Sequence, residues 1–252
     1  MGSLRITLAV VFAVVITAIT SCSHQPVNHQ YLRVYVDGQS ALGITIWRQP
    51  RGLVIFFHGL DTDEYVLTGD KVHRRLTDQL VDAGFAVVAS KAGGNAYGNA
   101  ASQHNYRELG RVAVKHYQVA DVYLLAESMG TVAAVNLLAS SETFRIRGLA
   151  AINPVLDLNS APPGQADIAK RYRDESLGSV NPMKLPLDSL RGKNMRFYVS
   201  HDDSLAATEE HAAAFQTRFG SAAKISIVPC KGGELDPSCI QGTDIVRWFT
   251  SL

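Results

Sequence analysis

A serine in the middle of the chain has the neighbours that a nucleophile needs. Ser128 follows the apolar, strand-like run 122–126 and precedes the small, helix-compatible residues 130–134. The local sequence Ala-Glu-Ser-Met-Gly differs by one residue from G-x-S-x-G, the signature of a sharp strand-to-helix turn that exposes a serine hydroxyl. Such a turn leaves room only for small neighbours, which Ala126 and Gly130 provide, and the following helix start favours a developing negative charge. For this motif alone, a tight turn in an ordinary α/β protein is the alternative.

A second chemical candidate follows the apolar run 53–57. His58 and Gly59 come directly after it, and the small glycine would let the N–H of Leu60 approach a substrate oxygen. Removing one such donor typically slows a reaction about 100- to 1000-fold. We expect His58 itself to be a structural residue that hydrogen-bonds the loop, rather than one that transfers protons.

Together these features resemble the α/β-hydrolase family, whose chain order is nucleophile, acid, histidine. The resemblance implies that Ser128 is the nucleophile and that Asp203, at the exit of a predicted strand, is the acid. Asp202 is the second candidate for the acid, and capping of the next helix is the alternative role of either aspartate. The resemblance also implies an oxyanion hole formed by the main-chain N–H groups of Leu60 and Met129.

The histidine of the family pattern does not carry over. The loop 230–238 resembles the family pattern Gly-x-His-x-Asp-Pro-Ser, but Glu234 holds the position of the histidine. His211, the only histidine after Asp203, falls inside a predicted helix. A serine hydroxyl is a poor nucleophile unless a neighbour takes its proton. A free glutamate, with a pKa of about 4.3, suits that task near neutral pH less well than histidine does.

Three hypotheses about the base follow. In the first, Glu234 replaces the histidine and shares a proton with Asp203, in an arrangement similar to the Ser-Glu-Asp peptidases that would favour acidic pH. In the second, the site is inactive and the fold binds a ligand or a partner. In the third, a distant histidine reaches Ser128; the candidates are His58, His104 and His201.

The alternation of strand-like and helix-like segments predicts one α/β domain over residues 31–252. Segments 31–36 and 42–48 are expected to pair as an antiparallel hairpin. The strands and helices that alternate after them predict the α/β-hydrolase fold, a mainly parallel sheet with helices on both faces. In this family, the position of residues 155–193 belongs to a small cap over the substrate pocket. The remaining strands are predicted at 53–57, 85–89, 148–152, 194–200 and 223–229, and the helices at 70–83, 100–117, 131–140, 204–219 and 238–252.

The first thirty residues are not part of the predicted domain. Arg5 precedes an apolar run of 15 residues, 6–20, and a membrane-spanning helix needs about 20. The run ends in Ile-Thr-Ser-Cys, which resembles the bacterial lipobox. The resemblance implies a signal peptide over residues 1–21, a lipid on Cys22 that anchors the chain to a membrane, and a polar tether over 22–30. An ordinary secretory signal and a single-pass anchor are the alternatives.

Two further cysteines support export from the cytosol. Cys230 and Cys239 lie nine residues apart near the C-terminus. Outside the reducing cytosol, such a pair usually forms a disulfide. Two buried free thiols are the alternative, whereas a metal site lacks a third and fourth ligand at suitable spacing.

Composition excludes several other classes of protein. The 252 residues are 46% hydrophobic, which suits one globular domain with a sizeable core. The formal net charge is +1 and there is no basic stripe, so no nucleic-acid partner is expected. The glycine-rich loop 91–99 lacks the spacing of a phosphate cradle, so no nucleotide is expected there. No cofactor is expected elsewhere in the chain.

The sequence therefore predicts an exported, membrane-anchored serine hydrolase of esterase type that acts on acyl esters in the cell envelope. The alternative is a catalytically impaired relative that binds a cell-envelope ligand or partner. A transferase on the same fold is also compatible, because a fold does not determine a reaction.

Overall fold

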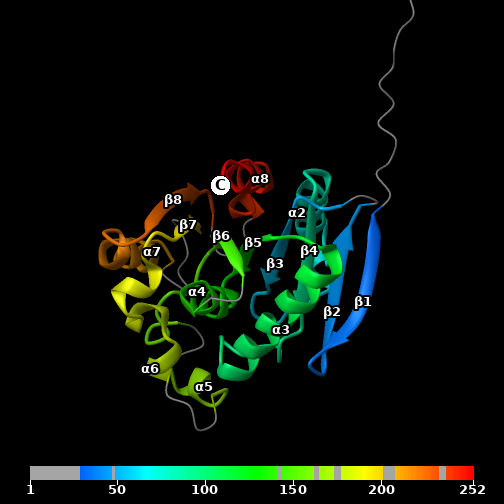
Figure 1. Cartoon of the computed structure of the whole chain (residues 1–252). Helices are drawn as coiled ribbons and strands as arrows, with labels where there is room; N and C mark the ends of the chain where they lie inside the picture. Colours follow the sequence, from blue (N-terminus) through cyan, green and yellow to red (C-terminus); the bar gives the residue numbers. More distant parts are fainter. Residues whose placement is uncertain are drawn as a thin grey trace, which may run out of the picture.

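Eight strands form one sheet in the computed structural model, which describes residues 29–46, 49–140, 144–161, 165–172, 177–200, 208–232 and 237–252. The strands are β1 (Gln30–Val36), β2 (Gln39–Thr45), β3 (Gly52–Phe57), β4 (Phe85–Ser90), β5 (Asp121–Glu127), β6 (Arg145–Ile152), β7 (Asn194–Ser200) and β8 (Lys224–Cys230). Their order in the sheet is β1-β2-β4-β3-β5-β6-β7-β8 (Figure 1). Strand β2 is antiparallel to its neighbours β1 and β4, and the other neighbouring strands are parallel.

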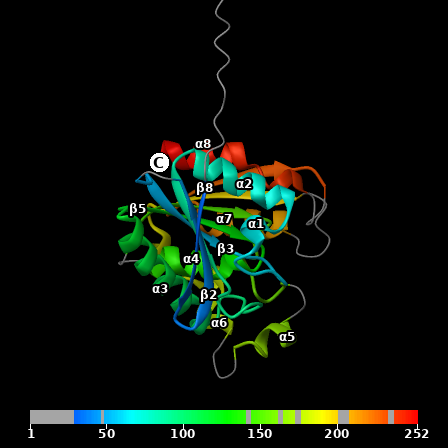
Figure 2. The same ribbon diagram turned by 90° about the vertical axis from the view of Figure 1, so that its right-hand side faces the viewer.

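Helices cover both faces of this sheet. Helices α2 (Lys71–Asp82) and α8 (Gly242–Ser251) pack together on one face, and α3 (Ala100–Tyr117), α4 (Gly130–Ser140) and α7 (Thr208–Phe219) lie on the other (Figures 1 and 2). None of the helices in the described ranges is both long and apolar enough to cross a membrane. The short helical segments are α1 (Val66–Gly69), α5 (Gln165–Ala169), α6 (Leu177–Val180), η1 (Pro182–Lys184), η2 (Leu187–Leu190) and η3 (Pro237–Cys239).

Strand β3 shows how the sheet is buried on both faces. Val54 and Phe56 belong to the apolar cluster beneath α2 and α8, whereas Ile55 and Phe57 belong to the cluster beneath α3 and α4. This alternation follows from the two-residue period of a strand. Each buried side chain of this size contributes about 1.5–3 kcal/mol. The loop that begins at His58 therefore starts from a strand held from both sides.

The predicted fold class is confirmed, with adjustments at the ends of elements. The hairpin predicted at 31–36 and 42–48 is present as β1 and β2, although β2 begins at Gln39 and ends at Thr45. Positions 47 and 48 of that predicted strand lie outside the described residues. Helix α1 was not predicted, because its four residues are too few to show a helical period.

The segment between β6 and β7 packs on the helix that follows Ser128. Its apolar side chains form a small cluster with Met129 and Val132, near the start of α4. The other buried members are Tyr97, Val155, Leu158, Ala161, Ile168, Tyr172 and Val180. This segment therefore packs against the start of α4.

Candidate active site

Ser128 occupies a strained turn between β5 and α4. Its φ angle is +47°, in the left-handed region that residues other than glycine seldom adopt. The Ser128 N–H donates to the carbonyl oxygen of Ile152 at 2.9 Å, and the Ser128 carbonyl oxygen accepts from the N–H groups of Thr131 and Val155, both at 3.1 Å. Backbone strain of this kind costs about 1–3 kcal/mol and persists only where the surroundings enforce it. The sharp strand-to-helix turn expected from the sequence is thus present at Ser128.

Gly130 allows α4 to approach the end of β3. A methyl group added at Gly130 would lie 2.4 Å from the carbonyl oxygen of Phe57 and 2.7 Å from that of His58. Neither main-chain oxygen can move without displacing the strand, so only glycine fits at this position. The small neighbour that the motif requires therefore has a steric cause.

The loop after β3 runs alongside the same turn. A methyl group added at Gly59 would lie 3.7 Å from Cβ of Ser128, an ordinary van der Waals contact. Leu60 follows in this loop and is 39% exposed, while Met129, beside Ser128, is buried. Within the described ranges, neither the Leu60 N–H nor the Met129 N–H donates a hydrogen bond. Two main-chain donors close to Ser128 are therefore available to another molecule.

His58 holds the loop in place. Its ring is buried, with Nδ1 at 2.8 Å from the carbonyl oxygen of Gly59 and Nε2 at 2.9 Å from that of Lys91. Both nitrogens thus face main-chain oxygens of two loops at the carboxyl ends of β3 and β4. This is the structural role expected from the sequence.

Other histidines also have partners away from Ser128. His104 is exposed on α3, with Nε2 at 3.4 Å from a carboxylate oxygen of Asp37. His211, on α7, has Nε2 at 2.9 Å from Oγ of Ser160. His201 lies outside the described residues. The structure therefore gives no support to His58 or His104 as the base that serves Ser128.

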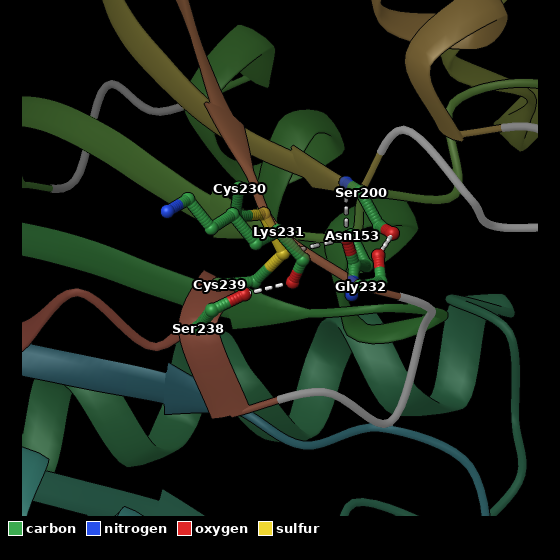
Figure 3. The surroundings of a disulfide bond; sticks show 7 residues. All are labelled: Asn153, Ser200, Cys230, Lys231, Gly232, Ser238 and Cys239. Carbon is green, nitrogen blue, oxygen red and sulfur yellow. Dashed lines mark hydrogen bonds between the residues drawn. A yellow bond between two sulfur atoms is a disulfide. The ribbon is translucent and has the colours of Figure 1, made fainter.

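Four of the predicted site residues fall outside the described ranges: Cys22, Asp202, Asp203 and Glu234. Two described residues that come shortly before Asp202, Asp203 and Glu234 in the sequence are hydrogen-bonded to each other. Oγ of Ser200, at the end of β7, donates to the carbonyl oxygen of Gly232, just after β8 (Figure 3). The Ser200 N–H donates to Oδ1 of Asn153 at 3.0 Å. The carboxyl ends of β6, β7 and β8 are thus tied together at the edge where ligands bind in α/β sheets.

The predicted disulfide is confirmed, and the alternative of two free thiols is wrong. Cys230, the last residue of β8, is bonded to Cys239 in η3, and their Cα atoms are 5.1 Å apart (Figure 3). Sγ of Cys239 also lies 3.4 Å from Oδ1 of Asn153. The bond closes the loop that includes position 234.

The structure brings together three ionisable residues that the sequence did not single out. Nδ1 of His73, on α2, lies 2.6 Å from Oδ2 of Asp70, and Nε2 lies 3.0 Å from Oε2 of Glu127. Burial lowers the pKa of His73, but the hydrogen bond and charge of Glu127, and then those of Asp70, raise it from 6.5 to about 9. Burial raises the pKa of Asp70, but hydrogen bonds from the main chain and ring of His73, the charge of that ring and a hydrogen bond from Val72 together lower it. Glu127 and His73 are 54 positions apart in the sequence. The only sign of Glu127 in the sequence is therefore its place next to Ser128.

A largely apolar groove lies elsewhere in the described molecule. A hollow of about 720 Å³ separates the β1–β2 hairpin from α3, and Leu32, Val112 and Tyr117 are among its lining residues. It does not include Ser128, so we do not assign it to the chemistry of the turn. No group of three or more His, Cys, Asp or Glu side chains within the described ranges is arranged to hold a metal ion.

Comparison with known proteins identifies the fold. No family model and no curated protein matches this sequence. Among solved structures, an esterase of Pyrococcus furiosus superposes with a TM-score of 0.67 at 13% identity, covering 89% of this chain and 93% of that one. A hormone-sensitive lipase from a metagenome library superposes with a TM-score of 0.68 at 14% identity, covering 88% and 84%.

The chain has the α/β-hydrolase fold. A prolyl endopeptidase is also similar, with a TM-score of 0.61 and 12% identity over 88% of this chain and 38% of that one. Esterase, lipase and peptidase thus share one α/β-hydrolase scaffold, so the fold does not determine the reaction. In this fold, the serine of the strand-to-helix turn works with main-chain N–H groups from the next residue and from the loop after the third strand. Ser128 lies between β5 and α4, Met129 follows it, and Leu60 lies in the loop after β3.

Proposed function

We propose that this protein is a serine hydrolase of esterase type. The backbone of Ser128 carries the proposal: a non-glycine residue is held at φ +47° between β5 and α4. The surroundings of Ser128 maintain this strain through hydrogen bonds to β6 and the segment after it. Such strain is typical of functional sites, because it fixes a reactive side chain in one position. Other non-glycine residues of the described ranges, such as Ala92 and Tyr97, also have positive φ, so the support comes from the strain together with the place of Ser128 between β5 and α4.

The arrangement supports acyl transfer in two steps. In the first, Oγ of Ser128 forms a bond to the acyl carbon, a base takes the hydroxyl proton, and the N–H groups of Leu60 and Met129 stabilise the oxyanion. The bond to the alcohol then breaks, and the alcohol leaves with the proton. In the second step, water attacks the acyl-enzyme in the same way, releasing the acid and restoring Ser128.

Glu234, with Asp203 beside it, is the base in this proposal. Asp203 follows Ser200 by three residues and Glu234 follows Gly232 by two, and Ser200 and Gly232 are hydrogen-bonded to each other. Two carboxyl groups that share a proton have one raised pKa, which makes one of them a better base than a free glutamate. The pair holds its shared proton only at acidic pH, so the activity is expected to be greatest there.

The proposed place of action is the cell envelope. Residues 1–21 would direct export, Cys22 would carry the lipid anchor, residues 22–30 would form the tether, and the catalytic domain would span 31–252 with its cap at 155–193. The Cys230–Cys239 disulfide supports a location outside the reducing cytosol. The substrate class is an acyl ester accessible from the membrane surface.

A second candidate function is a binding protein that has kept the fold without the reaction. The observation that favours it is Glu234 at the position of the family's histidine, together with the engagement of His58 and His104 elsewhere. In that case the strand-to-helix turn at Ser128 would serve to recognise a ligand or partner in the envelope.

Hydrolysis of p-nitrophenyl esters of short and medium acyl chains separates these candidates. We expect the full-length protein, kept in detergent, to hydrolyse such an ester, and both Ser128→Ala and Glu234→Gln to lose about 100-fold or more. Removing one member of a triad leaves residual catalysis, so the ratio between variants decides and weak turnover does not. Equal rates in all three proteins would reject the esterase and favour the binding protein.

A further inference from the structure

Three ionisable side chains in contact with one another lie beside the strand-to-helix turn at Ser128. His73 bridges two carboxylates, with its ring nitrogens 2.6 Å from Oδ2 of Asp70 and 3.0 Å from Oε2 of Glu127. A neutral imidazole carries only one N–H, so it could donate to only one of these acceptors. With both carboxyl groups ionised, both contacts are hydrogen bonds only when His73 is an imidazolium.

The start of helix α2 fixes the position of this ring. Asp70 caps the helix by accepting hydrogen bonds from the N–H groups of Val72 and His73 at 2.8 and 3.0 Å. The ring of Phe56, on β3, meets the His73 ring edge-on, with centroids 6.3 Å apart. The His73 side chain is only 14% exposed. The imidazolium is therefore held in place by its own helix and by the sheet.

Glu127 brings this charge pair to the site. It directly precedes Ser128, and a methyl group added at Gly59 would lie 3.8 Å from Cδ of Glu127 and 3.7 Å from Cβ of Ser128. Glu127 and Ser128 thus face the same loop, which also carries the N–H of Leu60. A carboxylate without a counter-charge at this position would oppose the negative charge that develops on an acyl oxygen.

We propose that His73 is a positioning residue of the Ser128 site: its imidazolium, oriented by Asp70, holds the Glu127 carboxylate and neutralises its charge where the acyl oxyanion forms. This inference rests on the proposed esterase function. The charged groups that act on the ring are Asp70 from α2 and Glu127 from β5, while β3 contributes only the Phe56 ring. With its pKa at about 9, His73 stays protonated at neutral pH. Above about pH 9, His73 loses this proton and Glu127 is left without its counter-charge.

The test compares wild type with His73→Gln, Glu127→Gln and the double variant, measuring kcat and KM for a p-nitrophenyl ester and the rate of fluorophosphonate labelling. His73→Gln is expected to lower kcat about 10- to 100-fold with little change in KM, because the charge of Glu127 then opposes the transition state. The double variant is expected to recover most of that loss, because it has no carboxylate to neutralise. A residue needed only for folding predicts the opposite, with the double variant worse than either single one.

The pH profile supplies a second readout. Beyond the decrease expected as the Glu234–Asp203 pair loses its shared proton, wild-type kcat should decrease further above about pH 9, and the double variant should lack this second decrease. His104→Gln is the matched control, since it removes an exposed His–Asp contact on α3 and should keep wild-type rates and the wild-type pH profile. If His73→Gln does not fold, the double variant compared with Glu127→Gln still decides: the two should have similar kcat, and a much lower kcat in the double variant overturns the inference.

Failure of this inference differs from failure of the proposed function. A wild type that reacts with fluorophosphonate while His73→Gln reacts equally fast overturns the role of His73 alone. So does a double variant that recovers nothing. A wild type that neither reacts with the probe nor hydrolyses esters overturns the esterase proposal and the role of His73 with it.

Discussion

Replacing Gly130 by alanine tests whether the close approach of α4 to β3 builds the site. The added methyl group would lie 2.4 Å from the carbonyl oxygen of Phe57, about 1 Å less than an ordinary contact of about 3.5 Å. The helix and strand must therefore separate by about 1 Å around Ser128. Forcing a methyl group into a filled space costs about 1–3 kcal/mol, and a displacement of about 1 Å at a reactive group costs about 100-fold in rate.

The assay measures urea unfolding and the rate of fluorophosphonate labelling for Gly130→Ala and for a matched control, Gly59→Ala. The control adds the same methyl group beside the same serine, but its nearest contact, to Cγ of Glu127, is an ordinary 3.6 Å. We expect Gly130→Ala to lose both stability and labelling, and Gly59→Ala to keep its stability. The reasoning is refuted if Gly130→Ala matches wild type in both measurements, or if Gly59→Ala is the less stable variant.

Three further predictions concern stability. The Cys230–Cys239 bond closes a loop with a sequence separation of 9. Replacing both cysteines by alanine should therefore lower the free energy of unfolding by about 3 kcal/mol, and a reductant should have the same effect on wild type. An unchanged urea midpoint would contradict this prediction. Glu64 is 1% exposed, and its Oε2 has no hydrogen-bond partner within the described ranges. Glu64→Met should therefore raise the free energy of unfolding by about 1–3 kcal/mol. A lower free energy of unfolding in this variant would show that the carboxyl group has a stabilising partner. The pKa of His73 is raised from 6.5 to about 9, so protonation of its ring adds about 3 kcal/mol to the free energy of unfolding. This contribution is fully present below about pH 6.5 and is lost as the pH rises through 9, so the stability difference between wild type and His73→Gln should shrink over that range. A difference that does not vary with pH would argue against a protonated His73 in the folded protein.

The fold could be predicted because its signals are local and periodic. The apolar run at 53–57 predicts a strand covered on both faces, and β3 is buried along its whole length. Helix 100–117 was predicted with the bounds that α3 has. Short elements without a full period, such as α1, escaped prediction.

The site could be predicted only where it is local in sequence. Ser128 is marked by its own neighbours, and the strained turn is present there. Glu127 and His73 form their contact across the fold. Glu127 occupies a position of the serine motif where any residue is allowed, and His73 belongs to no motif that the sequence shows. The role of Glu234 stays a prediction, because it lies outside the described residues.

Labelling of the full-length protein with a fluorophosphonate, between about pH 4 and 9, tests the central claim most directly. The account predicts one adduct per chain, mapped to Ser128 by peptide mass spectrometry, absent from Ser128→Ala and strongest at acidic pH. A wild type that forms no adduct at any pH would contradict it. If Glu234→His then became reactive, Ser128 and the loop that carries the Leu60 N–H would be intact. The wild-type protein would then be a binding protein that has kept the fold without the reaction.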